Sequence, residues 1–157
     1  MSIDSVKRYF ANWQMEDRVL EFTVSSATVA AAALAVGCRE QEIAKTMSFK
    51  LHDEAILIVL AGDARINNTK FKAQFKTKAI LLKGDEVEAR TGHPVGGVCP
   101  FDLPGDVTVY LDASLRRFAM VYPACGTANS AIGLTIPELE MTSRSVGWVD
   151  VSKIDEA

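Results

Sequence analysis

The sequence has few of the residues that form disulfide frameworks and metal centres. Its three cysteines, Cys38, Cys99 and Cys125, include no CxxC pair, and an odd number fits a reducing compartment better than an extracellular disulfide scaffold. The two histidines, His52 and His93, belong to no HExxH motif and stand at no ligand spacing from a cysteine, so no metal site is expected. Because GxGxxG, GxxxxGK(S/T) and GxSxG motifs are also absent, the sequence predicts no cofactor and no serine-hydrolase chemistry.

Long hydrophobic runs and an excess of one charge are missing as well. The longest apolar stretches, residues 27–36 and 55–61, fall well below the roughly 18 residues of a membrane-spanning helix. Asp4 stands where a signal peptide is basic or apolar. The net charge is only -3, whereas proteins that coat duplex nucleic acid carry a strong positive excess. We therefore expect a soluble cytoplasmic protein that contacts neither membranes nor duplex DNA.

The length and apolar content are those of one ordinary domain. The chain has 157 residues, 48% of them hydrophobic and 24% charged, and a chain of this size buries roughly 70% of its unfolded surface. Helical and strand patterns are mixed along residues 1–157 without a repeat or a linker. The sequence predicts a single compact α/β domain with a mixed sheet and short helices.

Hydrophobic periodicity places the individual elements. Helices are expected over residues 3–13, 29–36 and 85–91, around Phe71 and Phe75, and from residue 135 onward; strands are expected over 19–23, 45–51, 55–61, 107–111, 118–122 and 146–151. The apolar run at 55–61 is typical of a central strand buried on both faces. Alternation in 45–51 predicts Met47, Phe49 and Leu51 on the inner face and Thr46, Ser48 and Lys50 on the outer one.

Lys45 is a candidate site residue because it shares the inner phase of this strand. A lysine at such a position either extends its ammonium group to solvent or places it in a polar pocket, where it holds an anion or an oxygen atom. The residue pattern alone leaves both interpretations open.

Two loops are candidates for binding through their main chain. Residues 91–101, TGHPVGGVCPF, enclose a Gly-Gly pair between two prolines, which favours a rigid loop that can present N–H groups to an oxyanion or a carbonyl oxygen. Residues 124–130, ACGTANS, combine a glycine with three hydrogen-bonding side chains. Either stretch is equally compatible with an ordered turn that binds nothing.

The segment from Arg65 to Lys83 carries a local concentration of positive charge. It holds six basic residues and no acidic one: Arg65, Lys70, Lys72, Lys76, Lys78 and Lys83. The remaining 11 basic and 20 acidic residues give the rest of the chain a net charge of -9. A charge run of this kind forms either a solvated face or a patch that contacts phosphates.

Taken together, several segments resemble the YbaK and prolyl-tRNA synthetase-associated editing-domain family, which includes free-standing aminoacyl-tRNA deacylases. They are SSATVA at 25–30, IAKT at 43–46, GDARIN at 62–67, TGHPVGGVCPF at 91–101, VYLD at 109–112 and GTANSA at 126–131. The resemblance extends over residues 25–151 and implies a mostly antiparallel, strongly curved sheet.

The family resemblance implies hydrolysis of the ester that joins an amino acid to the terminal adenosine of a mischarged tRNA. Its lysine is matched by Lys45 and its Gly-x-x-x-Pro loop by Gly96 to Pro100. Lys45, Gly96 and Gly97 are therefore the catalytic candidates, which position the terminal ribose, the ester and water. Substrate contacts are expected from Met47, Phe49, His93, Val98, Cys99, Pro100, Gly126, Thr127 and Asn129. The expected partners are the acceptor end of mischarged tRNA, held at its phosphates by Lys70, Lys72 and Lys76, and an aminoacyl-tRNA synthetase.

Two other hypotheses compete with this one. Cys99 lies six residues after His93 and is either a thiol nucleophile or a small apolar filler in a tight loop. Alternatively, the protein is a catalytically silent module that binds the tRNA end or a synthetase. The amino acid removed depends on one or two residues of the pocket wall.

Overall fold

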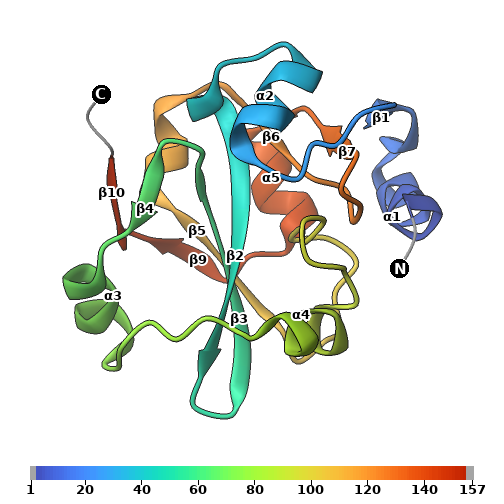
Figure 1. Cartoon of the computed structure of the whole chain (residues 1–157). Helices are drawn as coiled ribbons and strands as arrows, with labels where there is room; N and C mark the ends of the chain where they lie inside the picture. The colour runs from blue at the N-terminus through green and yellow to red at the C-terminus, as the bar shows by residue number, and fades with distance from the viewer. Residues whose placement is uncertain (1–2, 155–157) are drawn as a thin grey trace.

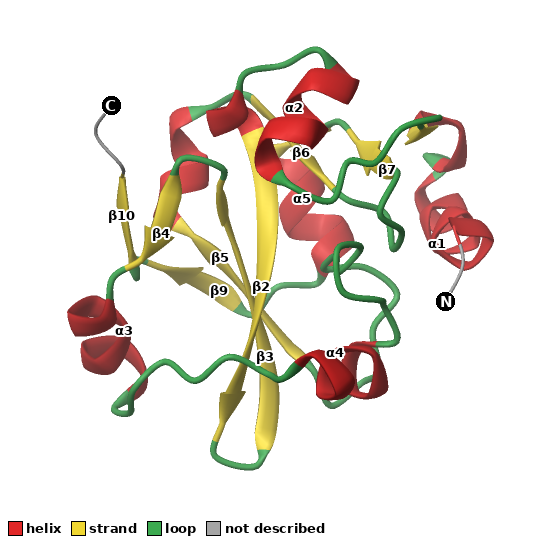
Figure 2. Ribbon diagram, in the orientation of Figure 1, coloured by secondary structure: helices red, strands yellow, loops and turns green. Residues whose placement is uncertain are grey.

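The computed structural model describes residues 3–154, which fold around a mixed sheet of six strands in the order β8-β6-β2-β3-β5-β9 (Figures 1 and 2). Two pairs, β1-β7 and β10-β4, form separate small sheets. The strands are β1 (Val19–Glu21), β2 (Ile43–Leu51), β3 (Glu54–Ala61), β4 (Ala64–Ile66), β5 (Thr108–Asp112), β6 (Met120–Pro123), β7 (Ser130–Ile132), β8 (Leu134–Thr135), β9 (Gly147–Val149) and β10 (Ser152–Ile154).

The predicted mixed sheet is confirmed, with parallel and antiparallel pairing nearly balanced among its six strands. β2 and β3 pair antiparallel over eight residue pairs, and β6 and β8 are also antiparallel. The pairs β2-β6, β3-β5 and β5-β9 are parallel. Parallel neighbours require a crossover, and the chain supplies one through α3 and α4 between β3 and β5 and another through α5 before β9.

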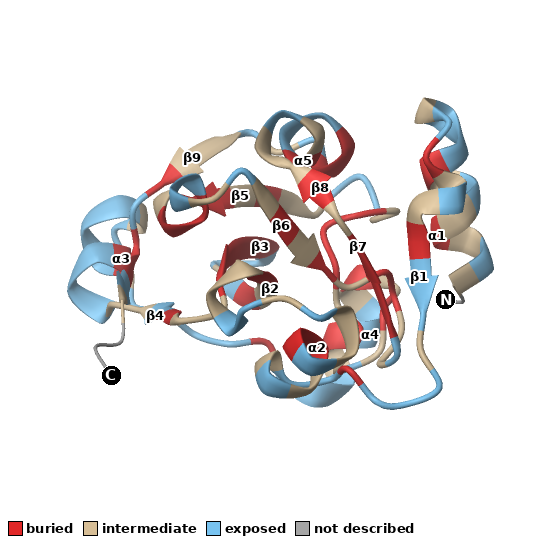
Figure 3. Cartoon of the chain, turned by 90° about the horizontal axis from the view of Figure 1, so that it is seen from above, coloured by how far each residue is buried: buried red, intermediate tan, exposed pale blue. Residues whose placement is uncertain are grey.

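The β2–β3 hairpin forms the centre of the molecule. Residues 55–61 of β3 are all at most 1% exposed, as the continuous apolar run predicts, and Figure 3 shows this strand enclosed by the other elements. His52 and Asp53 form the two-residue turn, with His52 at φ 57°. A positive φ in the first turn residue matches the strand twist that a tight hairpin requires.

Five short α-helices flank the sheet: α1 (Ile3–Phe10), α2 (Val29–Val36), α3 (Asn68–Phe75), α4 (Gly84–Thr91) and α5 (Ile136–Ser143). Side-chain caps begin three of them, because Thr28, Asn67 and Thr135 accept the N–H groups of Ala31, Lys70 and Glu138. The expected opening helix ends at Phe10 and continues as a 3₁₀ turn, Ala11–Trp13. The other expected helices are confirmed within one or two residues.

The strand predicted over 146–151 is confirmed only as β9 (Gly147–Val149), because the chain bends after it and continues as β10 in a different sheet. The bend is held by Asp112, which is fully buried and whose carboxylate accepts the Val151 N–H at 2.9 Å and the Ser152 hydroxyl at 2.6 Å. A third donor, the Ser114 N–H, lies 3.0 Å away. The contacts with Val151 and Ser152 join residues 39 and 40 positions apart, so no local sequence pattern predicts the bend.

Candidate functional site

A cavity of about 290 Å³ opens beside the N-terminal half of β2. Its lining residues come mainly from α2, β2, the loop at 95–98 and the strands β6 and β7. Its walls are Ser26, Ala27, Thr28, Val29, Ala32, Ile43, Ala44, Lys45, Thr46, Met47, Ser48, Leu81, Val87, Val95, Gly96, Val98, Tyr122, Ala124, Ser130 and Ala131. We call this cavity the β2 pocket.

The pocket exists because one edge of β2 is left unpaired. β6 pairs with β2 only at Ile43 and Ala44 and ends at Pro123, a residue without an N–H to extend a ladder. Further along, the β2 edge is taken up again by residues 80–82, through Leu82 N–H to Ser48 O (3.1 Å) and Lys50 N–H to Ile80 O (2.8 Å). Between these contacts the edge is open.

Thr46 is the residue that this gap exposes. Because strand main-chain groups alternate between the two neighbours, the N–H and C=O of Thr46 point to the same side as those of Ser48 and Lys50, into the pocket. Its Oγ1 is buried and has no hydrogen-bond partner among the described residues. The alternation of the sequence predicts only that Thr46 lies on an outer face, since alternation identifies the faces of a strand and not its open edges.

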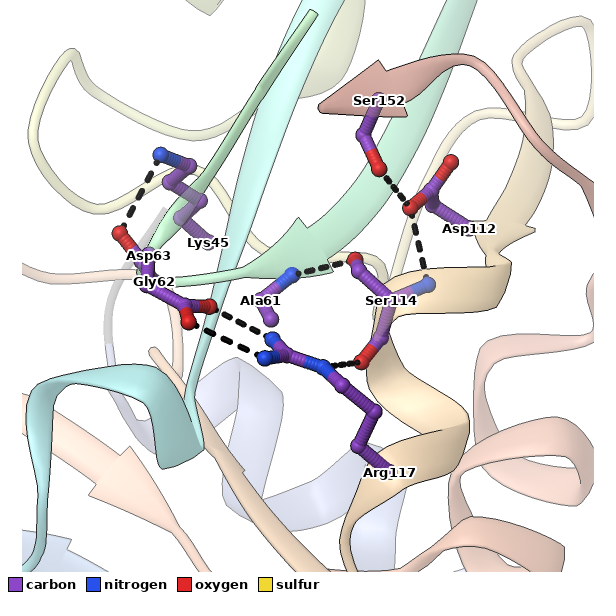
Figure 4. Close-up of polar contacts among 8 residues, drawn as sticks. All are labelled: Lys45, Ala61, Gly62, Asp63, Asp112, Ser114, Arg117 and Ser152. Atoms are coloured by element: carbon purple, nitrogen blue, oxygen red, sulfur yellow. Dashed lines mark hydrogen bonds and ion pairs between the residues drawn. The ribbon is translucent and has the colours of Figure 1, made fainter. Parts of the chain in front are cut away.

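Lys45 lines the same pocket, which is one of the two positions that its phase leaves open. Its Nζ lies 3.4 Å from the carbonyl oxygen of Gly62, the residue before Asp63 (Figure 4). Asp63 forms a two-pronged ion pair with Arg117, with oxygen to nitrogen distances of 2.5 and 3.0 Å. The Arg117 hydrogen bond, supported by the Lys45 charge, holds the pKa of Asp63 below its usual range. Lys45 therefore lies near the Asp63 carboxylate, which is ionised at neutral pH.

Gly62 fits this corner because it lacks a side chain. A Cβ at this position would lie 2.0 Å from the carbonyl oxygen of Glu40 and 2.8 Å from Val29 Cγ1. The close approach brings the turn after β3 under α2 and places the Gly62 carbonyl within reach of Lys45. The GD pair that the family resemblance includes is thus a structural support for the lysine.

The loop at 91–101 forms the opposite wall through Gly96 and Val98. Gly96 has φ 91°, a left-handed conformation that favours glycine. The Gly97 N–H donates to Pro94 O at 3.0 Å, so it is occupied within the turn. The amides of Gly96 and Val98 make no hydrogen bond among the described residues and are the available donors of this loop.

The residues predicted around 126–129 support the pocket from outside. A Cβ on Gly97 would lie 2.7 Å from backbone atoms of Thr127, so the two glycine-containing loops are packed together. Thr127 Oγ1 lies 2.7 Å from Ser130 Oγ, and Asn129 donates to Phe22 O at 3.0 Å. Gly126, Thr127 and Asn129 are not part of the pocket wall, whereas the neighbouring Ser130 is.

His93 and Cys99 are close together but enclosed. The Sγ of Cys99 lies 3.5 Å from Nε2 of His93, and both residues are 0% exposed. The same Nε2 lies 2.7 Å from Phe101 O, and since a carbonyl only accepts, Nε2 carries the proton and cannot serve as a base toward the thiol. Burial raises the pKa of Cys99 to about 12 and lowers that of His93. Neither these residues nor Pro100 line the β2 pocket.

Phe49 lies away from the pocket, although Met47 lines it. The Phe49 ring packs on Phe71 of α3, with 5.1 Å between ring centroids. The inward side chains of β2 therefore have two different environments. Those in the first half of the strand face the pocket, and those in the second half face the hydrophobic cluster under α3.

The three predicted phosphate contacts differ in their surroundings. Lys70 Nζ is bound to Asp150 at 3.1 Å and to Ser152 O at 2.9 Å, so it fastens α3 to β10. Lys72 and Lys76 are exposed, and their ammonium groups make no ion pair among residues 3–154. The chain after α3, residues 76–83, crosses in front of the hairpin toward α4 (Figure 1) and reaches the pocket at Leu81.

Comparison with known proteins identifies the family. Residues 23–141 match the model of the aminoacyl-tRNA editing domain. The chain belongs to the aminoacyl-tRNA editing domain family. It is 51% identical, over 98% of both chains, to the uncharacterized protein YwhH of Bacillus subtilis (strain 168). It is 33% identical over 120 residues to a proline–tRNA ligase of Desulfovibrio desulfuricans, of which it spans only 20%.

Solved structures agree with this assignment. A structure described as a candidate trans-editing enzyme for prolyl tRNA synthetase matches with a TM-score of 0.87 and 25% identity, over 98% of this chain and 99% of the other. The hypothetical protein APE2540 matches with a TM-score of 0.79 and 30% identity, over 92% and 99%. Within residues 3–154, no helix of this editing domain has the length and apolar character to cross a bilayer, and no three His, Cys, Asp or Glu residues form a metal-binding group.

Proposed function

We propose that this editing domain acts in trans as an aminoacyl-tRNA deacylase, which hydrolyses the ester of mischarged tRNA in the β2 pocket. The proposal is carried by one observation: Lys45, the open β2 edge at Thr46 and the unpaired amides of Gly96 and Val98 surround a single cavity. The names of its relatives make tRNA for proline carrying a wrong amino acid the first substrate to test. Such a reaction places the protein in the cytoplasm, with prolyl-tRNA synthetase as the enzyme whose errors it corrects.

The pocket residues supply positioning and charge stabilisation. Water adds to the ester carbonyl carbon, the bond to the ribose oxygen breaks, and that oxygen leaves with a proton from the water; a free amino acid and intact tRNA result. The amides of Gly96 and Val98 are donors for the carbonyl oxygen as it gains negative charge. The Lys45 ammonium balances charge on the terminal nucleotide, and the main-chain groups of Thr46 bind the aminoacyl group.

The test of the site is Lys45→Ala, with Lys50→Ala on the same strand as the matched control. We expect kcat/KM for hydrolysis of mischarged tRNA to fall by about 10²-fold or more, as for loss of one stabilising donor, while Lys50→Ala retains wild-type activity because Lys50 is exposed outside the pocket. Thermal unfolding of both variants checks that the fold persists. Full activity of Lys45→Ala refutes the assignment.

The buried Cys99–His93 pair argues against a thiol nucleophile. A thiol with a pKa of about 12 holds almost no thiolate at neutral pH, and His93 has its proton on the nitrogen nearest the sulfur. We expect Cys99→Ser to retain most activity and the wild type to form no acyl-enzyme. Mass spectrometry of the protein mixed with mischarged tRNA detects such an adduct if the cysteine hypothesis is correct.

The hypothesis of a silent binding module has its own readout. If the wild-type protein binds mischarged tRNA but releases no free amino acid above the uncatalysed rate, the module hypothesis replaces the deacylase proposal. A panel of tRNAs for proline charged with different small amino acids defines the specificity in the same assay.

For the tRNA itself we propose that Lys72 and Lys76 contact acceptor-strand phosphates, with residues 76–83 leading the strand to the pocket. Neutralising both lysines removes two contacts, so the slope of log Kd against log salt should decrease by about 0.7 for each, with KM raised and kcat unchanged. Arg8→Gln is the control, since Arg8 is exposed on α1, at the end of the molecule opposite α3 (Figure 3). An unchanged slope means that the patch is merely solvated.

A further inference from the structure

A second cavity, of about 280 Å³, lies on the other side of the glycine loop. Pro100 lines it, whereas Gly96 and Val98 line the β2 pocket. Its walls are Tyr9, Pro100, Asp102, Leu103, Pro104, Gly105, Val107, Thr108, Val109, Ser143, Arg144 and Val146. Val146 is 65% exposed and Pro104 and Gly105 are exposed as well, so the cavity is reached from the surface. We call it the α5 cavity, because α5 ends in it.

The α5 cavity is lined by a buried hydroxyl, that of Ser143, which forms no hydrogen bond with the described residues. Ser143 is the last residue of α5 and is 3% exposed, and its Oγ has no hydrogen-bond partner among the described residues. Such a group loses its hydration on folding without replacement, at a cost comparable to a lost hydrogen bond. A ligand with a polar group at this position would restore that bond.

Two opposite charges flank the same cavity without meeting. Neither Asp102 nor Arg144 forms an ion pair within residues 3–154, so their charged atoms are more than 4.0 Å apart. The Arg144 guanidinium lies over the rings of Tyr9 and Trp13, 5.3 and 5.7 Å from their centroids. Both charges act on the pKa of the Tyr9 phenol, which burial raises, Arg144 lowers and Asp102 raises. The phenol donates to the Thr142 carbonyl oxygen of α5. Tyr9 therefore lies near both charged residues and is bound to the C-terminal end of α5.

We propose that the α5 cavity binds a small aliphatic α-amino acid as its zwitterion. Arg144 pairs with the carboxylate, and Asp102 pairs with the ammonium group. The C-terminal carbonyls of α5 also favour a cation at this end, and Ser143 Oγ supplies the remaining hydrogen bond. The aliphatic side chain contacts the apolar walls formed by Leu103, Val107 and Val109. This site is separate from the β2 pocket and does not depend on the deacylase activity.

Calorimetric titration of the full-length protein with L-valine tests the proposal. L-valinamide keeps the cation and loses the carboxylate, and 3-methylbutanoate keeps the carboxylate and loses the cation. We expect valine to bind and each single-charge analogue to bind about tenfold more weakly or worse, since each lacks one charged partner. Absence of any binding of valine at about 10 mM, or equal affinity for the three compounds, overturns the proposal.

Variants assign the binding to this cavity. Arg144→Gln and Asp102→Asn should each weaken valine about tenfold or more; asparagine tolerates the positive φ of 53° at residue 102. Arg116→Gln is the matched control, an arginine stacked 4.0 Å from the Trp148 ring centroid and outside the cavity. If melting curves show that Arg144→Gln is unfolded, Ser143→Ala, which only removes the unpartnered hydroxyl, takes its place. Valine binding that Lys45→Ala abolishes and these variants leave intact belongs to the β2 pocket and refutes the proposal.

Discussion

Substitution of Gly97 by alanine should separate the two loops that shape the β2 pocket. A Cβ built at this position lies 2.7, 2.7 and 2.8 Å from the Cα, N and C atoms of Thr127. All three atoms belong to the main chain, so no rotamer change relieves the overlap, and the loops must move apart by about 0.7 Å to restore ordinary contact. Overpacking of this kind costs about 1–3 kcal/mol, which lowers Tm by about 2–4 °C for each kcal/mol in a chain of this size.

The displacement should also lower the rate of hydrolysis. Gly96 and Val98 flank the moved residue and line the pocket, and a shift of this size at positioned donors costs about 10²-fold in rate. Gly84→Ala is the matched control, because a Cβ there meets nothing within 4 Å. Denaturant unfolding and hydrolysis of mischarged tRNA measure both effects. If Gly97→Ala equals Gly84→Ala in stability and in kcat/KM, the packing of the two loops does not shape the site.

Three further substitutions test single contacts. Asp112→Asn replaces an acceptor of three buried hydrogen bonds by a group that accepts fewer, and should cost about 2–4 kcal/mol in denaturant unfolding. The hydrogen bond from Arg18 lowers the pKa of Glu138 from 4.5 to about 2. The pair therefore stabilises the fold above about pH 4.5, and its contribution of about 1–2 kcal/mol should vanish between pH 4.5 and 2, with no such loss in Glu138→Gln. Thr46→Val removes a hydroxyl that has no hydrogen-bond partner among residues 3–154, so stability should stay within about 1 kcal/mol. Because the proposed substrate contacts come from the Thr46 main chain, KM should also stay close to the wild-type value; a destabilised variant would reveal a structural role, and a raised KM would show that the hydroxyl binds substrate.

Much of the fold follows from local patterns in the sequence. The apolar run of β3, the alternation in β2 and the caps at Asn67 and Thr135 each describe an environment that neighbouring residues create. The bend between β9 and β10 does not, because the acceptor that holds it, Asp112, is brought there by the sheet. The environment of Phe49 is also not predictable from local sequence. Alternation predicts that its side chain points inward, but not that it packs on α3 and lies away from the pocket.

The candidate site also contains some residues that the sequence predicts and others that it does not. Lys45 and the 91–101 loop are found from phase and composition, and the family resemblance joins them. Thr46 is missed because its importance comes from a missing neighbour, since β6 stops at Pro123 before covering it. The role of Gly97 is also tertiary, because its own N–H is used within the turn and its lack of a side chain serves the contact with Thr127.

The net charge of the chain gives little information about the basic surface between Arg65 and Lys83. Of the six basic residues between Arg65 and Lys83, Lys70 is committed to Asp150 and Ser152, so the local excess available to a ligand is smaller than the sequence suggests. Lys72 and Lys76 remain exposed beside the chain that leads to the pocket. A duplex-coating protein requires many such contacts, whereas a deacylase must release its tRNA after one hydrolysis. A few exposed lysines on α3 and at its end, on an otherwise acidic molecule, suit brief binding of a single acceptor end.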